Sequence, residues 1–369
     1  MIRRRLLVTG AGTGPSNNLM RSLRAGDLPI FIVGCHDDRF YLGKSAAQRN
    51  YLVPSPKHPD FANALRQISR AERIDLLIPT SDRDVLRVSA LRAEVRCGTF
   101  LPKHSLIALC KDKYEFTSLL RARGVRVPQT YVVKDLNSIE ALFRQFPSGS
   151  PLWCRIRSGS GALGATPVTT PAQARNWIRY WIDVRGVSPA SFTLSEYLPG
   201  RDFSCQSLWK DGTLIVAKTF ENLSPFGPSG QPSVISSVAA LAKTVREPRV
   251  ADLCTQAIRT LDNRASGVYC FDVKEDSSGA PCLTDINAGR FSMSTNLYDL
   301  TGKHNMAITY VRLALGHRIN VHNEYDVAEG YYMVRDADTE PDVLHAQDFF
   351  RDIGDARGAV KTVNRFPTH

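Results

Sequence analysis

Short apolar runs and segments of helical periodicity alternate over the first hundred residues. Residues 5–10, 29–38 and 73–84 are apolar runs that predict buried strands. The stretches 19–26 and 61–71 repeat apolar residues every three or four positions, as amphipathic helices do. Strands that alternate with helices are typical of an open parallel sheet, so we predict a Rossmann-like α/β domain over the first 102 residues.

Polar residues follow these predicted strands at the edge where open α/β sheets bind ligands. They are Asp37, Thr80, Ser81 and Asp82. The same residue types also cap helices, and capping is the better explanation for each residue taken singly. We therefore treat this edge as a candidate functional rim.

A glycine-rich turn, GAGTGPSNN, follows the first predicted strand. The dinucleotide-binding fingerprint needs glycine at positions 10, 12 and 15, and the third position is Pro15. Asp37 and Asp38 end the second strand, about where a ribose-binding acid lies in dinucleotide domains. An NAD(P)-dependent oxidoreductase that uses this sheet is therefore kept as an alternative.

The segment CKDKYEFTSLLRARG predicts a helix that begins near Cys110 and ends at Gly124. Lys111 and Lys113 stand at its start. A lysine at a helix N-terminus gains nothing from the helix dipole, which suggests an anionic partner such as phosphate. A solvated lysine is the commoner outcome.

Residues 151–168 predict two strands joined by the flexible loop SGSGALG. Successive glycines let backbone N–H groups approach phosphate oxygens, so this loop can close over a nucleotide. Arg155 and Arg157 are two apart on one strand and therefore share a face, which suits phosphate binding or simple solvation. The Walker A pattern is absent.

Residues 192–220 predict a strand that ends at Glu196, Tyr197 and Leu198, then a turn and two further strands. A carboxylate just past an apolar strand can bind an adenine edge, and Asp202 beyond the turn can bind ribose hydroxyls. A plain β-meander explains this segment equally well. The Gly, Pro and Ser-rich stretch 221–233 predicts a long loop at the mouth of the site.

The stretch from Gly267 to Phe291 predicts a hairpin that carries acids. Asp285 and Asn287 lie two apart on one strand and share a face, and Asp272 can reach them from the neighbouring strand. Carboxylate and amide oxygens are the ligands that Mg²⁺ prefers, with substrate phosphates completing its shell. The alternative is a surface hairpin whose acids are solvated.

Residues 301–369 contain no evident candidate functional residues. We expect one amphipathic helix over 301–316, ended by Gly316, and short strands with polar turns over 321–369.

Composition narrows the function classes. The net charge is +11, but the arginines are scattered and no nucleic-acid-binding motif accompanies them, so nucleic acid is not an expected partner. The eight cysteines form no CxxC pair, which argues against a zinc site or a disulfide framework. The start lacks the apolar core of a signal peptide and no apolar run reaches 18 residues, so we expect a cytoplasmic protein with no membrane partner.

Four segments in order resemble the ATP-grasp superfamily, and most closely the ligases similar to one half of the carbamoyl-phosphate synthetase large chain. They are KDKYEFTSLLRARGVRVP, WCRIRSGSGALGATPV, SEYLPGRDFS and FDVKEDSSGAPCLTDINAGRF. The resemblance covers roughly residues 1–320 and implies an ATP-grasp fold, α/β in its first domain and α+β overall. It implies a pre-ATP-grasp domain (1–102), a linker helix and small lid (103–194), a larger antiparallel catalytic subdomain (195–320) and a C-terminal extension (321–369).

The resemblance also implies roles for individual residues. Lys113 and Arg155 match the basic residues that hold ATP phosphates, and Arg290 matches an arginine that steadies the transferring phosphoryl group or the substrate carboxylate. The expected catalytic residues are Arg155 and Arg290. The expected nucleotide-binding residues are Lys113, Arg155, Ser158, Gly159, Ser160, Gly161, Gly164, Glu196, Tyr197, Leu198 and Asp202, and the expected metal ligands are Asp272, Asp285 and Asn287.

The implied reaction is amide bond formation driven by ATP. ATP and one or two Mg²⁺ ions, with Mn²⁺ as a substitute, would convert a carboxylate into an acyl phosphate, which an amine then attacks. The partners would be a small-molecule carboxylate and amine, and a homodimer is left open. Asp285 stands where the family usually has glutamate, so a nucleotide-binding module without catalytic activity is a further alternative.

Overall fold

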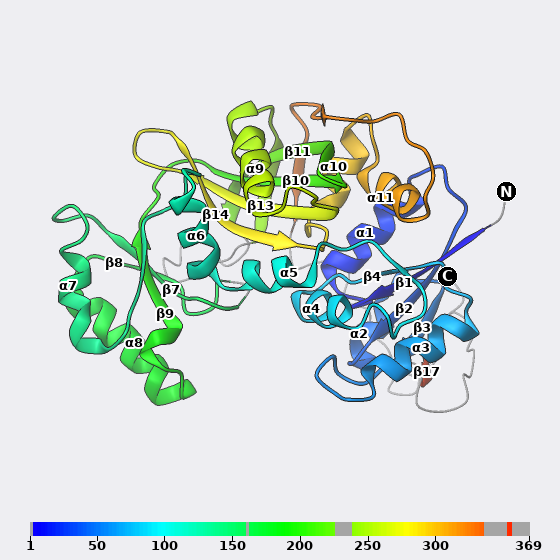
Figure 1. The fold of residues 1–369 in the computed structure, drawn as a ribbon, viewed down its shortest axis with the longest axis horizontal. Helices are drawn as coiled ribbons and strands as arrows, with labels where there is room; N and C mark the ends of the chain where they lie inside the picture. Colours follow the sequence, from blue (N-terminus) through cyan, green and yellow to red (C-terminus); the bar gives the residue numbers. More distant parts are fainter. Residues whose placement is uncertain (1–2, 160–161, 226–237, 336–352, 356–369) are drawn as a thin grey trace.

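A computed structural model of the chain describes residues 3–159, 162–225, 238–335 and 353–355, and within them three β-sheets (Figure 1). A parallel sheet lies at one end of the molecule and a small antiparallel sheet at the other. The largest sheet lies between them, beside two consecutive helices that run along it. The predicted α/β class with an antiparallel remainder is confirmed.

The six-stranded sheet has the order β17-β3-β2-β1-β4-β5, and all its strands are parallel. Leu6 and Val8 face α1, whereas Leu7 packs with α3 and α4 on the other face, because side chains alternate along a strand. The strands are Arg4–Thr9 (β1), Ile30–His36 (β2), Arg49–Leu52 (β3), Leu76–Ile78 (β4), Gly98–Thr99 (β5) and Ile353–Asp355 (β17). The helices are Gly14–Arg24 (α1), Arg39–Gly43 (α2), Phe61–Ala71 (α3) and Asp82–Ala90 (α4).

The four-stranded sheet is antiparallel, with the order β6-β9-β7-β8. Phe192 and Leu194 of its central strand are fully buried against α8. The strands are Thr130–Val132 (β6), Leu152–Ile156 (β7), Thr166–Val168 (β8) and Phe192–Glu196 (β9). The helices are Ile139–Phe143 (α7) and Pro171–Arg185 (α8), with 3₁₀ turns at Leu136–Ser138 and Pro189–Ser191.

The seven-stranded sheet has the order β14-β13-β10-β11-β12-β16, and β15 pairs with β11. Asp211 and Gly212, both with positive φ, form the tight turn between β10 and β11. The strands are Asp202–Lys210 (β10), Thr213–Pro225 (β11), Ala239–Thr244 (β12), Gly267–Glu275 (β13), Pro281–Ala288 (β14), Glu324–Tyr325 (β15) and Tyr332–Val334 (β16). The helices are Pro248–Leu261 (α9), Thr295–Thr301 (α10) and Met306–Ala314 (α11).

Two consecutive helices join the parallel sheet to the rest of the molecule (Figure 1). They are α5 (His104–Lys111) and α6 (Lys113–Ala122), and they replace the single helix predicted from Cys110 to Gly124. The side chain of Asp112 accepts hydrogen bonds from the backbone N–H groups of Tyr114 and Glu115, which starts a new helix at Lys113. Lys111 therefore ends α5 and only Lys113 begins α6.

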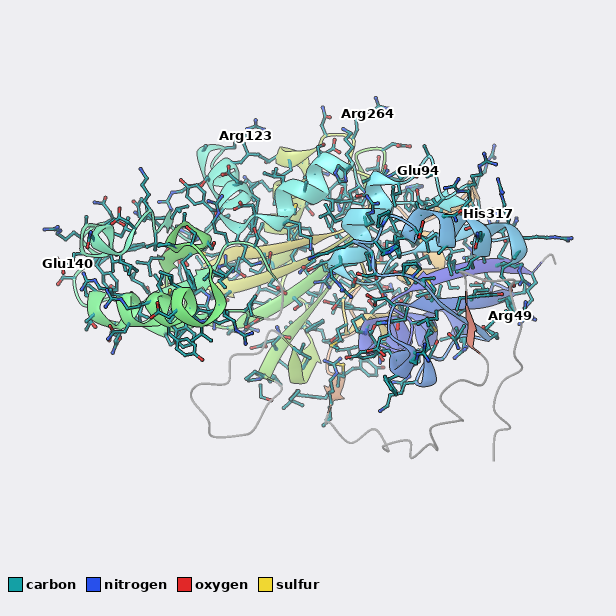
Figure 2. All side chains as sticks on the ribbon, turned by 90° about the horizontal axis from the view of Figure 1, so that it is seen from below. Arg49, Glu94, Arg123, Glu140, Arg264 and His317 are labelled. Atoms are coloured by element: carbon teal, nitrogen blue, oxygen red, sulfur yellow. The ribbon has the colours of Figure 1, made fainter. Side chains whose placement is uncertain are left out.

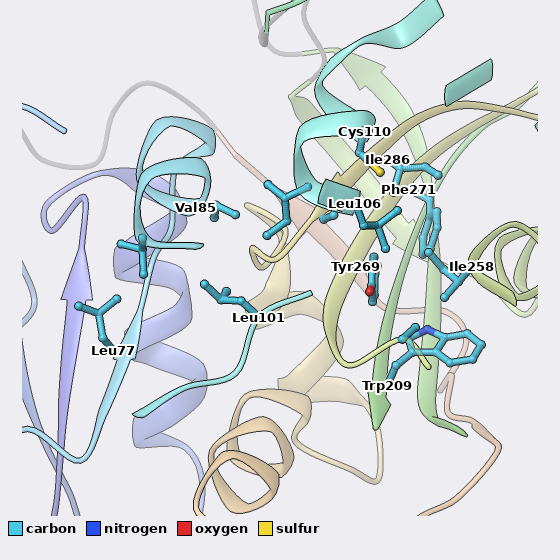
Figure 3. Packing of buried hydrophobic residues seen from close by; sticks show 14 of the residues in the cluster. Leu77, Val85, Leu101, Leu106, Cys110, Trp209, Ile258, Tyr269, Phe271 and Ile286 are labelled. Atoms are coloured by element: carbon cyan, nitrogen blue, oxygen red, sulfur yellow. The ribbon is translucent and has the colours of Figure 1, made fainter. Parts of the chain in front are cut away.

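A continuous hydrophobic cluster joins these parts. Tyr269 and Phe271 of β13 pack with Ile258 of α9 and with residues of α5, and the cluster continues to Leu77 of the parallel sheet (Figure 3). Burial of this apolar surface stabilises the arrangement of α5 between two sheets.

Three other expectations are corrected. The helix predicted over 301–316 begins only at Met306, because the side chain of Asn305 caps it through the N–H of Ile308, and Thr301 is the last residue of the preceding helix α10. The predicted loop 221–233 is strand as far as Pro225, and its remainder lies outside the described residues. Strand β3, Arg49–Leu52, was not predicted.

Charged side chains are spread around the outside of the molecule. Arg123, Arg264 and Glu140 are exposed, and Glu140 lies at one end of the molecule, away from the other two (Figure 2). This fits the scattered arginines of the sequence better than a single basic surface. In the described part of the chain, none of the helices has the length and apolar character needed to cross a membrane.

Candidate active site

The hairpin of β13 and β14 forms the floor of the candidate site. Asp272 and Asp285 are directly opposite each other in the strand register, and a bulge follows between Asp272 and Val273. Asp285 and Asn287 share one face, while Ile286 between them points into the hydrophobic core beside Cys110 (Figure 3). The predicted convergence of these two strands is therefore present.

The two opposed carboxyl groups are electrostatically unfavourable on their own. Burial raises the pKa of Asp272, and the negative charges of Asp285 and Asp202 raise it further. A cation placed between the carboxylates would relieve this repulsion.

Lys113 connects the floor to the loop after β7. Its Nζ lies 3.2 Å from Oδ2 of Asp285 and donates a hydrogen bond of 2.8 Å to the carbonyl of Gly159. The lysine is 9% exposed. It is thus held at the start of α6 with its charge inside the site, as the sequence suggested.

Arg155 and Arg157 have different environments although they are two apart on one chain segment. Nη2 of Arg155 donates to the carbonyl of Thr284 at 3.1 Å, and its buried Nε has no hydrogen-bond partner among the described residues. Arg157 instead pairs with Asp112 at 2.6 Å. Burial lowers the pKa of Arg155, opposed by the charges of Asp285 and Asp272. Arg155 therefore has a donor available for a ligand, whereas Arg157 has a structural partner.

Arg290 joins the floor to the parallel sheet. Its Nη2 donates to Oδ1 of Asn287 at 2.6 Å, and its Nε donates to Oδ1 of Asp82 at 2.6 Å. Lys111 lies 3.3 Å from the other oxygen of Asp82. Burial alone would raise the pKa of Asp82, but these two cations hold it below its usual range.

Helix capping accounts for Ser81 of the predicted rim but not for Asp82. Ser81 caps α4 through the N–H of Asp84, and Asp38 caps α2 through the N–H of Phe40. Asp82 is therefore free of a capping role and belongs to the Lys111–Asp82–Arg290 bridge. The bridge itself was not predicted, because it joins residues 208 positions apart.

Some of these groups line a cleft that opens to solvent and has an empty volume of about 340 Å³, its open mouth included. One wall comes from α4 and α5, the floor from β14, and Lys113 and Gly159 close the far side. The polar residues that line it are Asp82, Lys111, Lys113, Gly159, Asp285 and Asn287.

The predicted hinge and ribose residues lie next to this floor. Glu196 ends β9 and is exposed, whereas Leu198 is 5% exposed and the ring of Tyr197 lies 6.3 Å from that of Trp153. Asp202 accepts a hydrogen bond of 2.8 Å from Asn222, and burial raises its pKa. Asp202 begins β10 two residues before Ser204, which is opposite Asp272, so the two acids share one face of the sheet.

The predicted flap loop is described only in part. Ser158, Gly159 and Gly164 are described, whereas Ser160 and Gly161 lie outside the described residues. Gly164 has φ 64°, and a Cβ there would lie 2.8 Å from the side chain of Ile156, so glycine is required. Its carbonyl accepts a hydrogen bond of 3.0 Å from Trp177, which anchors this end of the loop to α8.

The donor set suits a hard divalent cation. Within the described ranges no cluster of three or more His, Cys, Asp or Glu side chains could hold a metal. Two carboxylates and the amide oxygen of Asn287 nonetheless meet the requirement of Mg²⁺, which keeps several waters and binds substrate phosphates. The residues present therefore fit Mg²⁺ carried by a nucleotide.

The glycine-rich turn is poorly suited to a dinucleotide. A Cβ at Gly12 would overlap the carbonyl oxygen of Tyr41, and a Cβ at Gly14 would lie 2.7 Å from the side chain of Met293. Protein atoms thus pack closely against Gly12 and Gly14, so close packing explains these two glycines and they give no support to a dinucleotide site. The oxidoreductase alternative loses its main support.

The described part of the chain has the ATP-grasp fold, as predicted. Its structure is similar to an L-amino acid ligase from Bacillus licheniformis, with a TM-score of 0.63, 12% identity, and coverage of 85% of this chain and 74% of that one. It is also similar to an N5-carboxyaminoimidazole synthetase from Staphylococcus aureus, with a TM-score of 0.64, 13% identity, and coverage of 88% and 80%.

A third similar structure carries ligands. It is the biotin carboxylase domain of the Hydrogenobacter thermophilus 2-oxoglutarate carboxylase, in complex with MgADP, ADP and bicarbonate. Its TM-score is 0.67 at 13% identity, with coverage of 89% of this chain and 73% of that one. Protein-family models and curated protein sequences give no match.

Proposed function

We propose that this protein is an ATP- and Mg²⁺-dependent ligase that joins a carboxylate to an amine. The observation that carries the proposal is the opposition of Asp272 and Asp285 on the hairpin beside the cleft, with Lys113, Arg155 and Arg290 each bonded to residues of β14. Paired acids beside three basic side chains suit a metal-bound triphosphate, because the acids can bind the metal ion and the basic side chains can bind the phosphates. The fold shared with an L-amino acid ligase supports the same class.

The proposed reaction begins with attack of a substrate carboxylate on the γ-phosphorus of ATP. The bond from the γ-phosphorus to the bridging oxygen breaks, and ADP leaves with that oxygen while an acyl phosphate forms. An amine then attacks the acyl carbon, and inorganic phosphate leaves as the amide forms. The amine loses a proton to the medium in this second step.

The side chains lower the repulsion between the two anions in the first step. Lys113 and Arg155 would neutralise phosphoryl oxygens, and hydrogen bonds to Asn287 and Asp82 hold Arg290 beside the metal ligands proposed here. Mg²⁺ on Asp272, Asp285 and Asn287 would supply further charge neutralisation and fix the phosphates.

The nucleotide would extend from this floor toward the smaller sheet. Glu196, Tyr197 and Leu198 would contact the adenine, and Asp202 the ribose. The loop 158–164 would cover the phosphates and keep water from the acyl phosphate.

The test is ADP release over a panel of small carboxylic acids with hydroxylamine present. Hydroxylamine converts an acyl phosphate into a hydroxamate, so a hydroxamate formed with ADP identifies both the class and the first substrate. ATP binding without ADP release across the whole panel contradicts the proposal and favours a non-catalytic nucleotide-binding module.

A further inference from the structure

A second cavity opens at the carboxyl end of the parallel sheet, with an empty volume of about 400 Å³ when its solvent-filled mouth is included. It lies between the ends of β1 and β2 and the segment after β4, where open α/β sheets commonly bind ligands. It adjoins the first cleft, because Asp82 lines the cleft whereas Ser81, Arg83 and Asp84 line the cavity. None of the residues assigned above to ATP or metal lines this cavity.

Asp84 is the buried acid of the cavity. The residue is 5% exposed, and its Oδ2 accepts a hydrogen bond of 2.8 Å from the hydroxyl of Thr9. Among the described residues its carboxyl group has hydroxyl partners and forms no ion pair, and the nearby charge of Arg83 only partly offsets the effect of burial. Burial raises the pKa of Asp84. A buried carboxylate without a cationic partner is costly, and a bound cation would offset this cost.

A second acid and a neutral histidine lie beside it. Asp37 is 20% exposed, and Arg83 is 3.7 Å away on the outer side, where that arginine is 57% exposed. His36 accepts the backbone N–H of Asp38 at its Nδ1, and burial lowers the pKa of His36. Burial thus disfavours a positive charge on this histidine, whose Nδ1 lies 3.2 Å from Oδ1 of Asp37, and the cavity has two acids, this histidine and one solvated arginine.

Part of the cavity lining is apolar. Val53, Pro56 and Phe61 line it, and Val53 and Phe61 are almost fully buried. A cavity lined by both apolar residues and acids suits a short aliphatic chain that ends in a cationic group. The apolar residues can contact the methylenes, and the carboxylates can bind the cation.

We propose that this cavity binds an aliphatic primary ammonium group, with the ammonium between Asp84 and Asp37 and the methylenes against Val53 and Phe61. The identity of the ligand rests on the proposed ligase function. If the protein is a ligase, the cavity selects a substrate that carries a second, unreactive ammonium group. The reacting end of that substrate extends toward the adjoining cleft.

Calorimetric titration of the full-length protein without ATP tests the binding. The probes are 1,5-diaminopentane and glutarate, which have the same carbon number and opposite charge. We expect diaminopentane to bind and glutarate to give no heat.

The variant Asp84→Asn keeps the shape of the side chain and the acceptor for Thr9. We expect its affinity for diaminopentane to fall by at least about tenfold.

Two further variants secure the interpretation. If Asp84→Asn does not fold, Asp37→Asn serves instead, because Asp37 is partly exposed. Asp252→Asn, on the exposed side of α9, should bind diaminopentane as the unaltered protein does. Absence of diaminopentane binding, equal binding of glutarate, or equal affinity in the two cavity variants and the unaltered protein overturns the inference.

The outcome is separable from that of the proposed function. Hydroxamate formation without diaminopentane binding overturns the cavity assignment and leaves the ligase proposal standing. Diaminopentane binding that is lost in Asp84→Asn supports the cavity as a cation site even if the carboxylic acid panel releases no ADP.

Discussion

Arg290 and Asp82 form an ion pair of 2.6 Å between two sheets that are built from distant parts of the chain. Asp82 starts α4 beside the parallel sheet, and Arg290 follows β14 of the largest sheet. Because the same guanidinium also holds Asn287, the position of a proposed metal ligand depends on the neighbouring domain. The two parts of the molecule are thus coupled at the cleft.

The variant Asp82→Asn tests this coupling. It removes the charge that orients Arg290 and Lys111 but leaves the proposed nucleotide contacts intact. We expect the kcat for ADP release to fall about tenfold while the KM for ATP changes less than about threefold. Steady-state kinetics measures both constants.

The matched control for this variant is Asp27→Asn. Asp27 also forms a 2.6 Å pair, with Arg312, but it is 70% exposed at the surface. Exposed ion pairs contribute little, so this variant should keep full activity. Equal loss of activity in both variants would show that the effect of Asp82→Asn is not local.

The variant Asp285→Ala should abolish ADP formation. It removes one of the two opposed carboxylates and the partner of Lys113, so no pair of acids is left to hold the metal. A coupled assay for ADP measures the loss, with Asp252→Ala on α9 as the control for removal of an acid. Substantial residual turnover would disprove the metal assignment.

The variant Lys113→Met should reduce kcat/KM for ATP by about 100-fold, because it removes a buried charge placed toward the phosphates. The same variant loses the hydrogen bond to Gly159, so the flap loop should become more accessible to protease. Lys134→Met, at an exposed position of the small sheet region, is the control and should behave as the unaltered protein. Unchanged ATP kinetics in Lys113→Met would exclude the lysine from the nucleotide site.

Glu72 provides a pH test that is independent of function. Burial alone would raise the pKa of Glu72, but hydrogen bonds from Tyr51 and Arg49 and the charges of Arg49 and Arg5 hold it below its usual range. The carboxylate therefore stabilises the fold above its unfolded pKa near 4.5, and this stability is lost as pH falls through the lower folded value.

The variant Glu72→Gln should lower the free energy of unfolding at pH 7 by roughly 2 kcal/mol, because hydrogen bonds to a charged group are lost. Below the folded pKa the difference between the variant and the unaltered protein should shrink. Urea unfolding at several pH values measures this. A difference that stays constant from pH 7 down to acid would contradict the assignment.

The strands and helices with strong apolar periodicity could be predicted from the sequence. Leu6 to Val8 and Phe61 to Ile68 carry patterns that only burial explains, and both are in the core. Strand β3, with the sequence RNYL, has no such pattern, because its arginine pairs with Glu72 at one end of the sheet. Its pairing depends on tertiary contacts that a local pattern does not contain.

The candidate site also has features that the sequence predicts and features that it does not. Asp272, Asp285 and Asn287 could be grouped from the sequence, because strand periodicity and a short turn bring them together. The division into two helices at Asp112 could not be predicted, because an N-capping aspartate and a mid-helix aspartate have the same sequence signature. The partners of Arg155 and Arg290 come from other sheets, so only the folded chain reveals them.

The segment after residue 320 has a structural consequence of its own. β16 pairs with β12, β17 pairs with β3, and Asp326 lies 2.9 Å from Nζ of the fully buried Lys218. Cutting the chain at residue 320 would therefore strip an outer strand from two different sheets and leave an ammonium ion in the interior without its nearest counter-charge. The described strands of the predicted C-terminal extension therefore belong to two sheets, and a chain that ends at residue 320 should misfold.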